Sequence, residues 1–160
     1  LRPKSEGGLF TGKEDERKSI LRLIAEYNPF LLDVEFNTIQ KDKKFASYLK
    51  KSKCKLLISW HDFKKTPNES QLKSRFNKMR KFSNVVKIVT VAKNVSDASR
   101  LLSLYSVKSK NKMVAFCMGD QGKFSRILCL HLGCPFTYVS LGKAIAPGQF
   151  SVDEIKSLEN

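Results

Sequence analysis

Two periods of apolar residues alternate along the chain. Apolar positions that recur every three or four residues predict helices at residues 13–27, 40–51, 68–82 and 121–132, and in a segment that Ser96 can cap. Short, nearly continuous apolar runs predict strands at residues 30–36, 55–60, 85–91, 113–118 and 136–141. A capping box, Ser151-Val-Asp-Glu154, opens a final short helix. The pattern therefore predicts five strands, each followed by a helix, with one further helix ahead of the first strand.

Strands that are apolar throughout and alternate with helices favour an α/β fold with a parallel sheet covered on both faces. Each strand–helix unit takes roughly 25 residues, so eight units would need about 200, near the lower limit for a (β/α)8 barrel. Two folds therefore stay open. One is an open, doubly wound five-stranded sheet. The other is a TIM-type (β/α)8 barrel of which this chain supplies about five units, its first three strands lying outside the sequence.

Composition indicates one globular domain over residues 1–160, because 41% of the residues are hydrophobic and 28% are charged. Lys and Arg number 30 against 15 Asp and Glu, a formal charge of +15. This excess keeps a basic nucleic-acid-binding module as an alternative, although no RNP-type aromatic motif or zinc finger accompanies it. No apolar run approaches the ~18 residues of a membrane span, so we expect no membrane partner.

The four cysteines are not spaced as CxxC, and the sequence has only two histidines, so we expect no metal site. Most of the cysteines have apolar neighbours, as buried reduced thiols do. This predicts a cytoplasmic protein.

The candidate chemistry lies inside the strands and at their carboxyl ends, where parallel α/β folds place their sites. Lys87 interrupts the run VVKIV, so it either protects an exposed edge strand or is buried. Burial would lower its pKa and free the amine to attack a ketone or aldehyde. Asp33 and Glu35 share one face of the first strand and could offset its charge. His61, at the end of the second strand, is a candidate general acid and base.

Six segments, in consistent order and spacing, resemble type I 3-dehydroquinate dehydratase, the Schiff-base hydro-lyase family of the shikimate pathway. They are RPKSEGG at 2–8, DVE at 33–35, SWHDF at 59–63, VVKIV at 85–89, MGDQGKFSR at 118–126 and APGQFSV at 146–152. The resemblance covers the whole chain. It implies a (β/α)8 barrel, and among the two folds left open it favours the incomplete barrel.

The resemblance also implies a reaction, the conversion of 3-dehydroquinate to 3-dehydroshikimate and water, with no cofactor and no metal. Lys87 would form the imine, and His61 would move the protons, a role that needs a pKa near neutrality. Glu6 would orient His61 as a third catalytic residue. Three residues would bind the substrate: Arg2, Arg126 and Gln149. Another Schiff-base barrel lyase or aldolase stays an alternative, and family members suggest a homodimer.

The chain departs from the family pattern in two places. It begins where the third strand should end, so the Glu-x-Arg motif of an early strand is not in the sequence; we therefore expect residues 1–160 to be the C-terminal part of the barrel. Ile145 stands four residues before Gln149, where the family often has a substrate-binding Ser or Thr. A contact from that side chain is expected to be lost.

Overall fold

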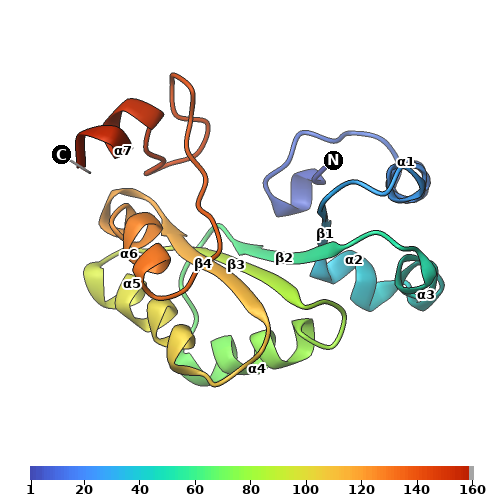
Figure 1. Cartoon of the computed structure of the whole chain (residues 1–160), viewed down its shortest axis with the longest axis horizontal. Helices are drawn as coiled ribbons and strands as arrows, with labels where there is room; N and C mark the ends of the chain where they lie inside the picture. The colour runs from blue at the N-terminus through green and yellow to red at the C-terminus, as the bar shows by residue number, and fades with distance from the viewer. Residues whose placement is uncertain (159–160) are drawn as a thin grey trace.

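The computed structural model describes residues 1–158, which form a parallel four-stranded sheet with most helices on one face (Figure 1). The strands lie side by side in chain order, β1-β2-β3-β4. Their bounds are β1 Leu32–Glu35, β2 Leu56–Asp62, β3 Val85–Val91 and β4 Lys112–Met118. The α-helices are α1 Glu14–Glu26, α2 Phe36–Lys41, α3 Lys43–Lys51, α4 Glu69–Met79, α5 Val95–Leu102, α6 Ser125–His131 and α7 Val152–Leu158. Short 3-10 helices are η1 Lys4–Glu6, η2 Ser103–Ser106 and η3 Asp120–Gly122.

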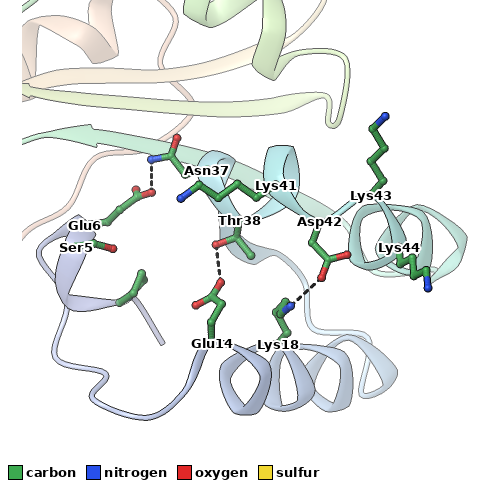
Figure 2. A pocket seen from close by; sticks show the side chains of 11 residues that line it. Ser5, Glu6, Glu14, Lys18, Asn37, Thr38, Lys41, Asp42, Lys43 and Lys44 are labelled. Carbon is green, nitrogen blue, oxygen red and sulfur yellow. Dashed lines mark hydrogen bonds and ion pairs between the residues drawn. The ribbon is translucent and has the colours of Figure 1, made fainter.

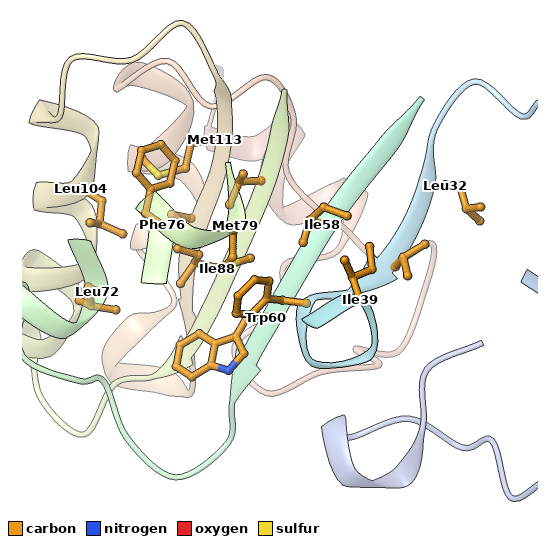
Figure 3. Packing of buried hydrophobic residues seen from close by; sticks show 14 of the residues in the cluster. Leu32, Ile39, Ile58, Trp60, Leu72, Phe76, Met79, Ile88, Leu104 and Met113 are labelled. Atoms are coloured by element: carbon orange, nitrogen blue, oxygen red, sulfur yellow. The ribbon is translucent and has the colours of Figure 1, made fainter. Parts of the chain in front are cut away.

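The larger apolar core lies between the sheet and helices α1 to α5. Figure 3 shows Ile58, Trp60 and Ile88 from the strands facing helix residues such as Leu72 and Phe76. All of these side chains are buried. Burying a large apolar side chain contributes about 1.5–3 kcal/mol, so this layer accounts for much of the fold's stability.

The opposite face of the sheet, called the inner face below, carries the polar residues. The strand register aligns Glu35 with Ser59, and Ser59 with Lys87. Successive residues of a strand point to opposite faces, so these three side chains share the face that Val34, Ile58 and Val86 do not. Lys87 lies on β3, which pairs with both β2 and β4. Edge protection therefore does not explain this lysine.

Four of the five predicted strands are confirmed, and the prediction of a strand at residues 136–141 is wrong. In the described part of the chain only Ser140 makes a β-bridge there, with Ser151, outside the sheet. Phe136 and Tyr138 instead pack on the inner face, with the Tyr138 ring 6.1 Å from that of Phe116. The aromatic residues of this segment pack through ring contacts, and the segment does not hydrogen-bond to the sheet as a strand.

The helix predicted at residues 40–51 forms as two helices. α2 begins directly after β1, and Asp42 then interrupts the helix and accepts a hydrogen bond from the Phe45 amide at 2.9 Å, as an N-cap does. The capping box is confirmed: the Glu154 amide donates to Ser151 Oγ at 3.1 Å, and the Ser151 amide donates to Glu154 Oε2 at 2.7 Å.

The cap expected at Ser96 lies two residues earlier. Asn94 Oδ1 accepts a hydrogen bond from the Asp97 amide at 2.9 Å, and α5 begins at Val95. Asn and Ser are both good N-caps, so composition alone does not choose between them.

Replacing Asn94 with Ala should destabilise the protein by about 1 kcal/mol, because the first turn of α5 loses its side-chain acceptor. Asn94→Ser keeps an acceptor and should cost less than half as much. The matched control is Ser96→Ala, which removes the hydroxyl that the sequence suggested as the cap. Urea unfolding midpoints measure all three; a larger loss for Ser96→Ala than for Asn94→Ala would contradict this cap.

Candidate active site

Lys87 is a buried amine on the inner face of the sheet, 5% exposed. Its Nζ lies 3.3 Å from Asp33 Oδ2 and 4.2 Å from the centre of the Tyr138 ring. Burial lowers the pKa of this amine below its ordinary value, while the Asp33 carboxylate opposes the shift. The result is a lysine that loses its proton more easily than a surface lysine does.

Arg2 brings a second cation to the carboxylates of β1. Its guanidinium lies 3.7 Å from Asp33 and 3.8 Å from Glu35. Behind them Arg17, fully buried, donates to Glu35 Oε2 at 2.6 Å and to Glu14 and Thr38. Burial raises the pKa of Glu35, and Arg17 opposes that shift. Charges of opposite sign therefore alternate from α1 across β1 to Lys87.

His61 follows Ser59 on the same face of β2, two positions closer to the carboxyl end than Lys87 is on β3. Its ring stacks on Phe63 at 5.9 Å, and its Nδ1 lies 3.9 Å from Glu6 Oε2. Burial is the main reason that the pKa of His61 falls to about 3, and the nearby cations Arg2 and Lys87 lower it further. The expectation of a near-neutral pKa is therefore wrong for the free protein, in which this imidazole is uncharged at neutral pH.

Glu6 lies on η1 and approaches His61 from there, and a residue of α2 holds its carboxylate in place. Asn37 Nδ2 donates to Glu6 Oε1 at 2.7 Å, a contact visible in Figure 2. Burial raises the pKa of Glu6. Gly7, at φ +74°, allows the end of η1 to pack closely on the Phe63 ring. Any residue with a Cβ would clash there, because that atom would lie 2.2 Å from Phe63 Cζ.

A pocket of about 780 Å³ lies between η1, α1 and α2, beside this cluster. It reaches the candidate residues only through Glu6, and its other walls carry lysines such as Lys41 and Lys43 (Figure 2). The pocket borders the Lys87 environment but does not contain the amine.

Arg126 lies on α6, away from the lysine, and is linked to it through aromatic rings. Its guanidinium carbon lies 4.5 Å from the centre of Phe116, whose ring contacts Tyr138 above Lys87. Burial lowers the pKa of this guanidinium, and Nη2 donates to the Pro147 carbonyl at 3.3 Å. Arg126 is 2% exposed and its Nε has no hydrogen-bond partner among the described residues.

Gln149 is not brought to the lysine cluster. Its Oε1 accepts hydrogen bonds from the amides of Ile145, at 2.9 Å, and Ala146, at 3.2 Å, so the side chain closes its own loop. Ile145 is 88% exposed, and its backbone amide is the group that contacts Gln149. The loop packs closely on the residue that follows β4. Gly148, at φ +69°, lies so near Gly119 that a Cβ on Gly148 would be 2.6 Å from the Gly119 carbonyl oxygen.

Several residues of the cluster were not found by reading the sequence. Asn37 carries no periodic signal, and the pattern around Tyr138 predicts a strand. Each residue joins the cluster through a contact between distant segments. Ser59 could have been found from strand alignment, since a small polar residue in an apolar strand beside a lysine is unusual.

Buried polar atoms without hydrogen-bond partners among the described residues concentrate here. Since such atoms are normally paired, their gathering is typical of a site that receives a polar ligand. They belong to Arg2, Glu6, Asp33, Ser59, His61, Arg126 and Thr137.

Residues 1–158 contain no group of three or more His, Cys, Asp or Glu residues arranged to hold a metal ion. No helix within these residues has the length and apolarity needed to cross a membrane.

Solved structures share this architecture. The type I 3-dehydroquinate dehydratase from Clostridium difficile, solved with covalently modified comenic acid, superposes with a TM-score of 0.86 at 25% identity, covering 99% of this chain and 65% of that one. The 3-dehydroquinate dehydratase from Aquifex aeolicus gives a TM-score of 0.82 at 28% identity, covering 99% and 70%. The four strands and their helices thus correspond to part of a TIM-type barrel.

Sequence comparison agrees with the structural match. The chain is 40% identical over 155 residues to the 3-dehydroquinate dehydratase of Pyrobaculum aerophilum, covering 96% of this chain and half the length of that relative. It is 36% identical over 157 residues to the enzyme of Dehalococcoides mccartyi, covering 96% and 70%. The model of the family "Type I 3-dehydroquinase" matches residues 1–159. With both sequence and fold in agreement, the chain belongs to the type I 3-dehydroquinase family.

Proposed function

We propose that the protein converts 3-dehydroquinate to 3-dehydroshikimate and water through an imine on Lys87. The observation that carries this proposal is the buried Lys87 amine, held between Asp33 and Tyr138 with its pKa lowered. A deprotonated amine is the form that attacks a ketone. Relatives named for this reaction support the substrate, and the chain would be the C-terminal part of their barrel.

In the first step Lys87 Nζ adds to the C3 carbonyl carbon, the carbonyl oxygen leaves as water with the two amine protons, and the imine nitrogen takes up one proton from solvent. The positive nitrogen then withdraws electrons from the adjacent carbon, which makes a C2 proton acidic. Asp33, 3.3 Å from Nζ, offsets the positive charge that the imine retains. Hydrolysis of the product imine returns the free amine.

His61 moves the proton in this proposal. Its neutral imidazole accepts the C2 proton and returns it to the departing C1 hydroxyl, so that water is lost from one face of the ring. Glu6, 3.9 Å from Nδ1, orients the imidazole and stabilises its transient positive charge. In the free protein His61 is in its neutral form at neutral pH, which is the form that accepts a proton.

Arg126 would pair with the substrate carboxylate, a task that suits a planar guanidinium. Arg2 would hold ring hydroxyls from the β1 side. Gln149 would contact the substrate only if its side chain gave up the hydrogen bonds that it now accepts from the Ile145 and Ala146 amides. No cofactor enters this scheme, and neither nucleic acid nor membrane is proposed as a partner. A homodimer and a cytoplasmic location stay predictions.

Reduction with borohydride in the presence of 3-dehydroquinate should attach the ligand to the peptide that contains Lys87. Peptide mass spectrometry measures this directly. The variant Lys87→Met is the control and should take up no ligand. Attachment to Lys93, Lys123 or Lys143 in place of Lys87 would overturn the assignment.

His61→Ala should still form the imine, more slowly, but lose water at least ~10²-fold more slowly, because the acid–base contribution is removed. Borohydride trapping and the appearance of the conjugated product separate the two steps. His131→Ala, which removes the exposed histidine of α6, is the matched control and should behave as the parent does. Turnover of His61→Ala within a few-fold of the parent would make His61 a structural residue.

Lys87→Met should gain stability relative to the parent as pH falls from 10.5 towards neutral, because it replaces an amine whose charge burial disfavours with an apolar chain of similar length. The folded-state pKa of Lys87 is below its ordinary value of 10.5, so protonation disfavours folding. This penalty is complete below the folded pKa, decreases as pH rises and disappears above 10.5. Denaturant midpoints over that pH range should therefore converge; a gain that does not change with pH would contradict the lowered pKa.

A further inference from the structure

Helix α6 ends in a turn that brings two cysteines together. Gly133, at φ +98°, donates its amide to the Leu130 carbonyl at 3.1 Å, and the Cys134 amide donates to the Cys129 carbonyl at 2.9 Å. This pair of hydrogen bonds defines a Schellman motif, in which the side chains at the Cys129 and Cys134 positions commonly contact each other, and here the two thiols interact. Apolar residues usually occupy both positions. Here both are thiols.

The two thiols are buried in one cluster on the inner side of the sheet. Cys129 is fully buried and Cys134 is 6% exposed. Cys129 Sγ donates to the Arg126 carbonyl at 3.3 Å, and Cys134 Sγ donates to the Phe136 carbonyl at 3.0 Å. The pair therefore joins the helix of Arg126 to the segment that leads to Tyr138.

The electrostatics of the pair differ from those of the other thiols. Hydrogen bonds with Cys129 and Tyr105 lower the pKa of Cys134. Burial instead raises the pKa of Cys54 and of Cys117. Since the thiolate is the reactive form, Cys134 is the thiol that reacts first.

We propose that Cys129 and Cys134 are an oxidation-sensitive dithiol that hydrogen peroxide converts to a reversible disulfide. The Cys134 thiolate attacks one peroxide oxygen, the O–O bond breaks, and hydroxide leaves and takes up a proton to become water. The Cys129 sulfur then attacks the resulting sulfenic acid, the S–O bond breaks, and the second water leaves with the Cys129 proton. Two thiols and one peroxide give one disulfide and two waters, and an added dithiol reductant reverses the step.

This inference is independent of the proposed reaction, because it concerns only the chemistry of the two thiols. Peroxide is small enough to reach Cys134, which is 6% exposed where Cys129 is fully buried, and the Schellman turn holds the resolving thiol next to it. The disulfide would fix residues 134–138 to the end of α6.

The test is to titrate the folded protein with hydrogen peroxide, alkylate the remaining thiols, and map the tryptic peptides. Cys129 and Cys134 lie on the same peptide, between Arg126 and Lys143, so the disulfide makes that peptide lighter by two hydrogens and blocks both alkylations. Dithiothreitol should restore them. Cys54 and Cys117 lie on other peptides and serve as internal controls that stay alkylatable. Oxidation of either control first, or sulfinic acid at Cys134 without a disulfide, would overturn the proposal.

Two variants test the partnership between the thiols. Cys129→Ser should leave Cys134 as a sulfenic acid that dimedone traps, whereas the matched Cys54→Ser should form the disulfide as the parent does. Phenylarsine oxide, which bridges adjacent thiols, should bind the reduced parent and Cys54→Ser but not Cys129→Ser. A parent that does not bind it, or a Cys54→Ser variant that loses the disulfide, would show that these thiols do not act together.

Discussion

The buried Lys87 amine sets the arrangement of the inner face. An amine removed from water needs compensation, and Asp33 on β1 supplies it at 3.3 Å. The β1 carboxylates in turn attract Arg2, and Arg17 holds Glu35 from α1. Each of these contacts joins a different segment to the sheet. The polar residues of the site therefore also position η1 and α1.

The same burial that disfavours the charge produces the reactivity. A lysine on the surface is protonated at neutral pH and attacks no ketone, whereas desolvation at Lys87 lowers the pKa of the amine. Burial likewise keeps the imidazole of His61 neutral, and the neighbouring cations Arg2 and Lys87 lower its pKa further. The free protein thus holds an amine with a lowered pKa beside a neutral imidazole. The shift at Lys87 costs folding stability at neutral pH, whereas the shift at His61 costs stability only below its ordinary pKa of 6.5.

The sequence predicts the sheet well because its signal is local. Apolar strands between helices, with polar residues at the carboxyl ends, predict both the parallel pairing and the positions of Lys87 and His61. The choice between a buried lysine and an edge lysine needed the strand order, since only pairing on both sides of β3 excludes the edge.

What the sequence did not predict depends on contacts between distant segments. Tyr138 was expected on a strand but lies as a ring over Lys87. Asn37 has no pattern of its own and is recognised only by its hydrogen bond to Glu6. Gln149 occurs in a clear motif, yet its amide oxygen binds its own loop. A sequence motif identifies a candidate residue, but only the folded structure shows which groups its side chain contacts.

The most direct test of this account is the pKa of the Lys87 amine in the folded protein. Competitive labelling with a trace amount of acetic anhydride over a range of pH gives the pKa of each lysine from its extent of acetylation. Lys108 and Lys110, exposed in the loop before β4, provide the reference in the same sample. We expect Lys87 to titrate below the ordinary lysine value of 10.5, and Asp33→Asn to lower its pKa further. A Lys87 that titrates together with Lys108 and Lys110 would contradict it.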